Sequence, residues 1–182
     1  MNPGFLYDTC TLQNFASVKR LDLLETRHGH LSPPRVTEGV LNEIARGARL
    51  GFAPSKMLWG WEWLGDPWMP DHNHQLDIQK IWRRLGGAEL IPPKNGGEAE
   101  SIAAAKIMGW RFVTDDHGAY NVAGTILGPS LVRDTVAILE DCCILDGLSP
   151  MDAASIANRM WNEGREFLRS RRPPFTPDVF RS

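Results

Sequence analysis

The sequence predicts an α/β fold in which helices cover both faces of a central, mainly parallel sheet. Two short and mostly apolar runs, Phe5–Tyr7 and Arg111–Thr114, have the composition of buried strands, and each leads into an acidic residue. The segments between and after them carry apolar residues at helical spacing. Because parallel strands need long crossover connections, this alternation of strands and helices favours a parallel sheet.

The first helices are predicted from periodicity and from capping residues. Apolar residues recur at roughly helical spacing after the first strand and predict a helix that Gly29 ends. These residues are Leu12, Phe15, Val18 and Leu21. Pro33 and Pro34 then interrupt the chain, and Thr37 is the expected N-cap of a helix from Glu38 to Arg49. Its predicted buried face consists of Val40, Leu41, Ile44 and Ala48.

The middle of the chain is less regular. Pro54-Ser55 opens a short helical piece, and Trp61–Leu64 alternates as a strand would until Asp66-Pro67 stops it. Helical spacing returns from Gln75 to Leu85, and Gly86-Gly87 ends that helix.

Glu98–Met108 is predicted to be a helix whose alanines allow close packing on the sheet, and a second helix is expected over Ala119–Leu127. Leu131–Leu139 mixes strand and helix signals, so its type stays open. Ser149-Pro150 begins a last helical region whose predicted inner face is formed by Ala153, Ile156, Met160 and Trp161. We expect a main domain over residues 1–148 and a helical extension over 149–182. Its Arg- and Pro-rich tail from Arg169 is expected to be mobile or docked on a partner.

Acidic residues recur where strands end and where helices begin. Asp8 follows the first strand, and Asp115 and Asp116 follow the second. In an open parallel sheet, ligands bind beyond the carboxyl ends of the strands. Carboxylates that converge there repel one another unless a cation neutralises them, and hard oxygen ligands select Mg²⁺ or Mn²⁺. The sequence therefore predicts a divalent metal site, to which Glu43 and Glu98 would add further carboxylates.

Each acid also has a simpler interpretation. Asp8 could cap the following helix, and Glu43 could be a solvated helix residue. Glu98 could complement the positive end of its helix dipole, a role that Glu100 would fill equally well. We choose Glu98 because the Gly96-Gly97 loop before it favours a close approach to the site.

In four places the sequence resembles the PIN-domain family of nucleases. The matching pieces follow the family's order from the start of the chain to about Ala123. They are Phe5-Leu6-Tyr7-Asp8-Thr9, Val40-Leu41-Asn42-Glu43-Ile44, Gly97-Glu98-Ala99-Glu100-Ser101-Ile102 and Val113-Thr114-Asp115-Asp116. Relatives with a double Asp often follow it with Ala-Arg, whereas this chain has Ala119-Tyr120. Any role that the arginine has in those relatives is therefore not carried over to this chain with the same support. The set of acidic residues is unaffected.

The resemblance implies a three-layer α/β/α PIN-like fold and a Mg²⁺- or Mn²⁺-dependent ribonuclease. The implied catalytic residues are Asp8, Glu43, Glu98 and Asp116, and the implied metal ligands are Asp8, Glu98, Asp115 and Asp116, with Asp116 ranked above Asp115. Thr9 and Thr114 are expected to orient these carboxylates or a water. The family further implies the toxin of a bacterial toxin–antitoxin pair, with an RNA substrate, a cognate antitoxin protein and a homodimer. Two alternatives are a non-catalytic PIN-like binding or scaffold module and a DNA-directed metal-dependent phosphohydrolase.

The composition is that of an ordinary globular protein. The chain has 182 residues, of which 42% are hydrophobic and 23% charged, and no apolar stretch is long enough to span a bilayer. Three cysteines form no disulfide framework, so we expect a cytoplasmic protein with no membrane partner. A net charge of −2 argues against a protein that coats nucleic acid nonspecifically, although it does not exclude a nuclease.

Two other features are given their simpler interpretation. His72 and His74 are expected to lie in a polar loop, because no second cluster completes a metal set. Five of the seven tryptophans lie between Trp59 and Trp82, where core packing or a hydrophobic partner surface is expected before base stacking.

Overall fold

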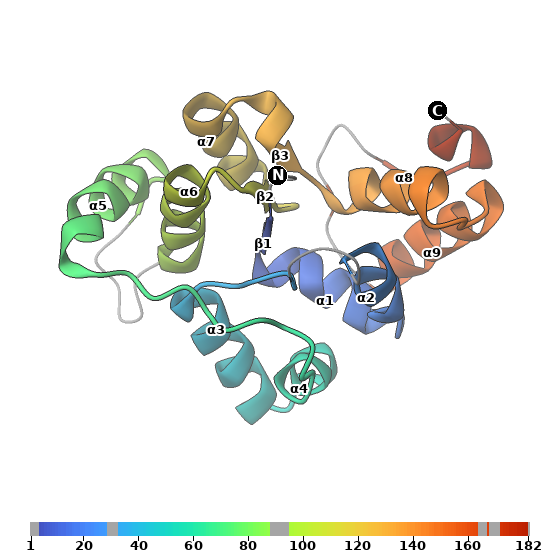
Figure 1. Cartoon of the computed structure of the whole chain (residues 1–182). Helices are drawn as coiled ribbons and strands as arrows, with labels where there is room; N and C mark the ends of the chain where they lie inside the picture. Colours follow the sequence, from blue (N-terminus) through green and yellow to red (C-terminus); the bar gives the residue numbers. More distant parts are fainter. Residues whose placement is uncertain (1–3, 29–32, 88–94, 164–166, 168–171, 182) are drawn as a thin grey trace.

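The computed structural model describes residues 4–28, 33–87, 95–163, 167 and 172–181. It has an α/β architecture with much more helix than strand (Figure 1). The elements in chain order are β1 (Phe5–Tyr7), α1 (Thr9–Ser17), α2 (Asp22–His28), α3 (Glu38–Arg49), α4 (Ala53–Trp59), η1 (His72–His74), α5 (Gln75–Arg84), α6 (Gly96–Met108), β2 (Arg111–Val113), α7 (His117–Leu127), η2 (Pro129–Leu131), β3 (Val132–Arg133), α8 (Thr135–Leu145), α9 (Pro150–Asn162) and η3 (Pro177–Phe180).

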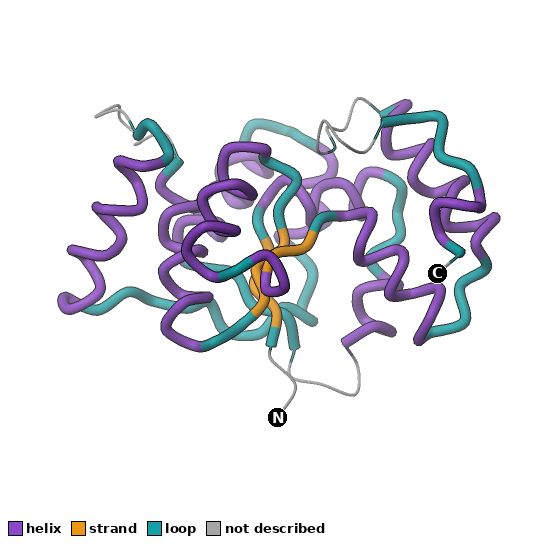
Figure 2. Tube along the Cα trace, turned by 90° about the horizontal axis from the view of Figure 1, so that it is seen from above, coloured by secondary structure: helices purple, strands orange, loops and turns teal. Residues whose placement is uncertain are grey.

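The described part of the chain contains one small sheet, in the order β1-β2-β3, with both pairs parallel. Leu6 lies opposite Phe112, and Phe112 lies opposite Val132, so the three strands end at one edge. Figure 2 shows the strands in the middle of the molecule with helices on either side. The predicted parallel α/β sheet is thereby confirmed.

Alternation along the strands sends side chains into two hydrophobic clusters. Tyr7 and Val113 join a cluster with residues of α1, α3, α8 and α9. Leu6 and Phe112 join the other, which α6 and α7 supply with closely packed alanines. The predicted close packing of the α6 alanines on the sheet is confirmed, since Ala103, Ala104 and Ala105 are fully buried there.

Capping residues and apolar spacing in the sequence predicted the positions of several helices correctly. α3 has the predicted bounds, and the Thr37 hydroxyl accepts a hydrogen bond from the Val40 amide as an N-cap should. Val40 and Ile44 are buried as expected, while Leu41 is half-buried and packs against the core. In α9 the predicted inner face holds for Ala153, Ile156 and Met160, but Trp161 is 43% exposed.

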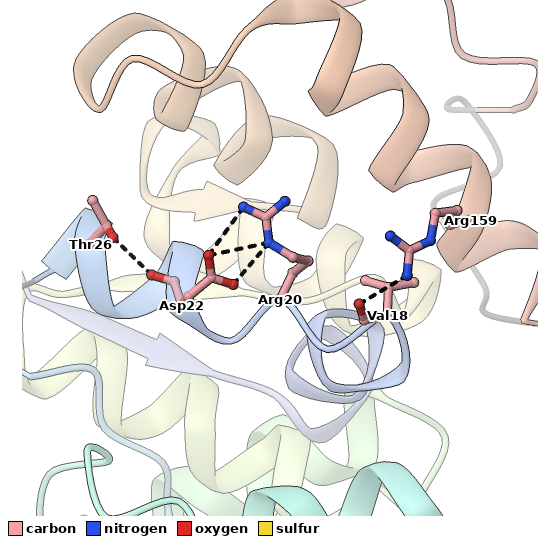
Figure 3. Close-up of polar contacts among 5 residues, drawn as sticks. All are labelled: Val18, Arg20, Asp22, Thr26 and Arg159. Atoms are coloured by element: carbon pink, nitrogen blue, oxygen red, sulfur yellow. Dashed lines mark hydrogen bonds and ion pairs between the residues drawn. The ribbon is translucent and has the colours of Figure 1, made fainter.

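Two local predictions are wrong. The single helix expected after β1 is two helices, because Lys19 adopts a left-handed conformation (φ 58°) and ends α1. In Figure 3, Arg20 pairs with Asp22 across this junction, and Arg159 of α9 donates to the Val18 carbonyl at the end of α1. The position of Gly29 lies outside the described residues.

The strand expected over Trp61–Leu64 is a turn. Its tryptophans pack instead on their neighbours: Trp61 lies against Trp63 in a tilted arrangement, and Trp63 lies against His28. Trp68 forms an isolated bridge with Thr37. These three tryptophans are half-buried, so only Trp59 of this stretch presents most of its surface to solvent.

The end of the chain belongs to the core. Phe175 and Phe180 are buried in the same cluster as residues of β1 and α1, and Asn158 of α9 hydrogen-bonds the backbone of Phe175 at 2.9 Å in both directions. The expected mobile or partner-docked tail is therefore wrong for residues 172–181, where apolar burial fixes the chain on α9. Residues 169–171 and 182 lie outside the described part.

Candidate active site

Asp8 stands at the carboxyl end of β1 and is buried, with 3% of its surface exposed. It is the N-cap of α1, and its Oδ1 accepts a hydrogen bond from the Thr9 amide at 2.6 Å. Its Oδ2 accepts from Thr114 Oγ1 at 2.8 Å and from Cys10 Sγ at 3.0 Å. The helix-cap interpretation is thus correct, yet it accounts for only one of the three bonds.

The electrostatic setting of Asp8 is unfavourable for a carboxylate. Burial, followed by the charge of Glu98, raises the pKa of Asp8 from 3.8 to about 6, and hydrogen bonds from Cys10, Thr114 and Thr9 only partly offset this. A carboxylate has about four acceptor positions, so three bonds leave one position on Oδ1 for a further partner.

Glu98 is the charged neighbour of Asp8. α6 begins at Gly96, two residues earlier than predicted, so Glu98 lies in its first turn, half-buried. It is close enough to Asp8 to raise the pKa of that residue. Glu100 has a different partner, because its Oε2 accepts from the Gly39 amide at 2.8 Å and so ties α6 to the start of α3.

Glu43 connects α3 to the same site. Much of the residue is exposed, but its carboxylate turns inward and accepts a hydrogen bond from Thr9 Oγ1 at 2.6 Å. Burial raises the pKa of Glu43, and the charges of Asp8 and Glu100 add to the effect. Thr9 therefore bridges two of the predicted carboxylates, donating its amide to Asp8 and its hydroxyl to Glu43.

Two glycines allow α3 and α6 to cross closely enough for this arrangement. A Cβ atom at Gly39 would lie 2.9 Å from the Gly97 Cα, and one at Gly97 would lie 2.9 Å from Glu43 Oε1. Contacts this short do not occur for real Cβ atoms without movement. Gly96-Gly97 was expected to allow a close approach to the site. In the structure the close approach is between α3 and α6.

Asp115 differs from the other acids because four hydrogen bonds from three residues hold its carboxyl group. Its Oδ1 accepts from the Thr135 amide at 3.1 Å. Its Oδ2 accepts from Asn14 Nδ2 at 2.8 Å, from Thr11 Oγ1 at 3.2 Å and from the Thr135 hydroxyl. Burial, together with the charge of Asp134, raises its pKa to about 7 despite these bonds. Asp115 thus joins β2 to α1 and α8.

Asp116 is exposed and caps α7, with Oδ1 accepting from the Ala119 amide at 2.7 Å. Its own amide donates to Thr114 Oγ1 at 3.1 Å, and that hydroxyl donates in turn to Asp8. Thr114 therefore couples the ends of β1 and β2. The capping bond engages Oδ1 of Asp116, and the residue stands exposed at the carboxyl edge of the sheet.

Cys10 was not identified from the sequence as a site residue. Its Sγ donates to Asp8 and accepts from the Asp115 amide at 3.4 Å, so it lies between the two buried carboxylates. Burial and the charges of both acids raise the pKa of Cys10 well above 9.0, so it stays a thiol. A cysteine two residues after Asp8 gives no signal of this role. Asn14, which donates a hydrogen bond to Asp115, could have been noticed in the sequence, because it is a polar residue next to the apolar face of α1.

The residues described in the structure hold no group of three or more His, Cys, Asp or Glu side chains arranged to bind a metal. His74 is accounted for by a capping box with Asp71, as the polar-loop interpretation expects. Comparison with models of protein families, with curated proteins and with solved structures gave no match. Among the helices that are described, none is both long and apolar enough to cross a membrane.

Proposed function

We propose that the chain is a Mg²⁺- or Mn²⁺-dependent ribonuclease whose reaction centre is formed by Asp8, Glu98, Glu43 and Asp116. The observation that carries the proposal is the state of Asp8, a buried carboxylate with one open acceptor position and an acid, Glu98, as its charged neighbour. Burying two carboxylates together costs free energy unless something neutralises them. Such a cost at the carboxyl edge of a parallel sheet is typical of a functional site.

The residues present suit a divalent ion of the Mg²⁺ type. Mg²⁺ is commonly held by one or two carboxylates, with waters and substrate phosphate oxygens completing its octahedron. Asp8 and Glu98 are the two carboxylates that would hold it, and Asp116 Oδ2 is a third oxygen at the same edge. The lack of a complete three-ligand group among the described side chains is compatible with that kind of site. When bound, the ion would supply positive charge at the scissile phosphate and a water of lowered pKa.

The surrounding side chains have supporting roles. Thr9 and Thr114 fix the two oxygens of Asp8, so that its open position points in one direction. Glu43, held by Thr9, is the acid best placed to accept a proton from an attacking water, because its raised pKa makes it a better base than an ordinary glutamate. Asp115, held by Thr11, Asn14 and Thr135, would keep β2, α1 and α8 together.

The fold supports this proposal and does not decide it. Helices pack on both faces of the sheet, which suits the three-layer PIN-like arrangement that we infer from the resemblance. A toxin role with an antitoxin partner rests on that resemblance alone. A Lys or Arg side chain inserted between Asp8 and Glu98 would neutralise them as a metal ion would, and so could inhibit the enzyme.

Cleavage assays test the proposal. Purified protein should cleave RNA with Mg²⁺ or Mn²⁺ and stop when a chelator is added in excess. Asp116→Asn should lose activity by orders of magnitude. Asp77→Asn is the matched control, since Asp77 makes only surface ion pairs with Lys80 and Lys106. Activity that survives excess chelator refutes the mechanism, and cleavage of DNA in place of RNA would favour the phosphohydrolase alternative.

A further inference from the structure

Two arginines of neighbouring strands belong to the same face of the sheet. Arg111 begins β2, and Arg133 ends β3, where it lies opposite Val113. Side chains alternate along a strand, and residues opposite each other in register share a face. Both arginines are therefore on the face of Phe5 and Val113, which lie in one cluster with residues of α8 and α9. The Arg111 guanidinium accordingly lies over the Phe5 ring, with its Cζ 5.2 Å from the ring centroid.

A third arginine comes to this face from α2. The ring of His28, the last residue of α2, lies 4.5 Å from the Phe5 ring, measured between centroids, so the end of α2 packs against β1. Arg27 directly precedes His28, and only 12% of its side chain is exposed. In Figure 1, α2 and α8 lie together on the side of the strands away from α6. Arginines of α2, β2 and β3 thus meet on one side of the sheet.

The described part of the chain leaves buried donors of all three arginines without partners. The Nε atoms of Arg27, Arg111 and Arg133 are buried and accept no hydrogen-bond acceptor from any described residue. Asp141 and Asp146 lie near Arg27, but the nearest oxygens are 3.9 Å and 4.0 Å from its nitrogens, which is too far for a hydrogen bond. Oδ2 of Asp146 is likewise buried without a partner in the described part.

Repulsion outweighs attraction at Arg111. Burial, followed by the charge of Arg133, lowers the pKa of Arg111, and the charge of Asp141 raises it by less than Arg133 lowers it. The charge of Arg27 lowers it further. Like charges that face each other on a sheet are destabilising, and unsatisfied donors in a half-buried setting add to the cost. An anion would remove both costs at once.

We propose that Arg27, Arg111 and Arg133 form a binding site for a phosphate group, supplied by inorganic phosphate or by a small phosphate ester. A guanidinium group presents N–H donors in a planar fork that matches the oxygens of phosphate. Three such groups from three elements suit a tetrahedral anion with several oxygens better than a carboxylate, which one fork satisfies. All three arginines are partly exposed, so a ligand can reach them. Arg111 begins β2, whereas Asp116 lies beyond its end, so this site is separate from the proposed reaction centre and does not rest on it.

Phosphate binding measured without divalent ions tests the inference. Inorganic phosphate is added to the full chain in excess chelator, at an ionic strength held constant with NaCl. The chelator prevents a metal ion from carrying phosphate to Asp8 and Glu98. At about five times its Kd, the ligand should raise the Tm of wild type by about 2–4 °C. Titration calorimetry gives the Kd.

Arg111→Gln/Arg133→Gln removes two of the three guanidinium groups and should weaken phosphate binding at least about tenfold. Arg111→Lys/Arg133→Lys keeps the charge without the planar fork and should bind with intermediate affinity. Arg83→Gln/Arg84→Gln, on the exposed side of α5, is the matched control and should bind as wild type does. If circular dichroism shows that the double Gln variant is unfolded, Arg133→Gln alone takes its place, because it keeps the contact between Arg111 and Phe5.

Each outcome decides for or against the site. No Tm rise in wild type overturns the inference. An equal rise in Arg111→Gln/Arg133→Gln also overturns it, because phosphate stabilises proteins in general by exclusion from their surface. Phosphate binding that needs Mg²⁺ and is lost in Asp8→Asn belongs to the reaction centre, which supports the proposed function and refutes this site. Tighter binding of uridine 5′-monophosphate than of inorganic phosphate supports the site with an ester as its ligand, and equal affinity supports it with the phosphate group alone.

Discussion

Asp8→Asn distinguishes the effect of the Asp8 charge on the stability of the protein from its effect on RNA cleavage. The substitution keeps the size of the side chain and removes its charge. In the folded protein the pKa of Asp8 is about 6, against 3.8 in its ordinary state. The folded state therefore binds the proton more tightly, and stability that is present at low pH is lost as pH rises from about 4 to about 6.

The size of the effect follows from the pKa difference. Two pKa units correspond to roughly 3 kcal/mol at pH 8, an upper bound on what the substitution recovers. An asparagine can keep its oxygen on the Thr9 amide and donate its amide to Thr114 Oγ1, so about 1 kcal/mol of hydrogen bonding is lost. We expect metal-free Asp8→Asn to be about 1–2 kcal/mol more stable than wild type at pH 8 and no more stable at pH 4.

The measurement is urea denaturation in chelator at pH 4 and pH 8, together with RNA cleavage in Mg²⁺. Cleavage should fall by orders of magnitude while stability at pH 8 rises. Asp77→Asn again serves as the control and should change neither quantity. If Asp8→Asn is less stable than wild type at pH 8, Asp8 is a structural anion, and the reasoning from an uncompensated carboxylate is wrong.

Three further predictions use the same structure. Mg²⁺ or Mn²⁺ should raise the Tm of wild type and leave the Tm of Asp8→Asn nearly unchanged, because an ion that binds only the folded state stabilises that state. Equal Tm shifts in both proteins would place the ion elsewhere. Burial lowers the pKa of His28 from 6.5 to about 3, so the free energy of unfolding falls as pH drops below 6.5. His28→Gln can still form the hydrogen bond with Tyr7 but does not titrate. In urea denaturation this variant should therefore lose less stability than wild type between pH 7 and pH 4. Gly39→Ala should destabilise the protein by about 1–3 kcal/mol, because the new Cβ would meet the Gly97 backbone. Gly124→Ala in α7, which has open space around it, should stabilise the protein by about 0.5–1 kcal/mol. Thermal melts that rank the two variants the other way would contradict the close crossing of α3 and α6.

The sequence by itself determined the features that depend on neighbouring residues. The bounds of α3 follow from the Thr37 cap and the apolar spacing after it, and the strands at Phe5 and Arg111 follow from short runs bounded by acids. Asp8 could be placed at the end of a strand for the same reason. The choice of Glu98 over Glu100 relied on the preceding glycines. In the structure the charge of Glu98 acts on Asp8, while Glu100 accepts a hydrogen bond at the start of α3.

The tertiary structure decided what depends on partners far along the chain. The alternation of Trp61–Leu64 looked like a strand, but a strand needs a neighbour to pair with, and these side chains pack around His28 instead. Leu131–Leu139 carried both strand and helix signals because it contains parts of both elements. β3, which pairs with β2, ends just before Asp134, and α8 begins just after it. The Asp134 carboxylate caps α8 by accepting a hydrogen bond from the Ala137 amide. Asp115 and Asp116 are adjacent in sequence and equivalent in charge. Only the contacts of Asp115 with Asn14 and Thr135, more than 19 residues away on either side, bury it and leave Asp116 at the open edge.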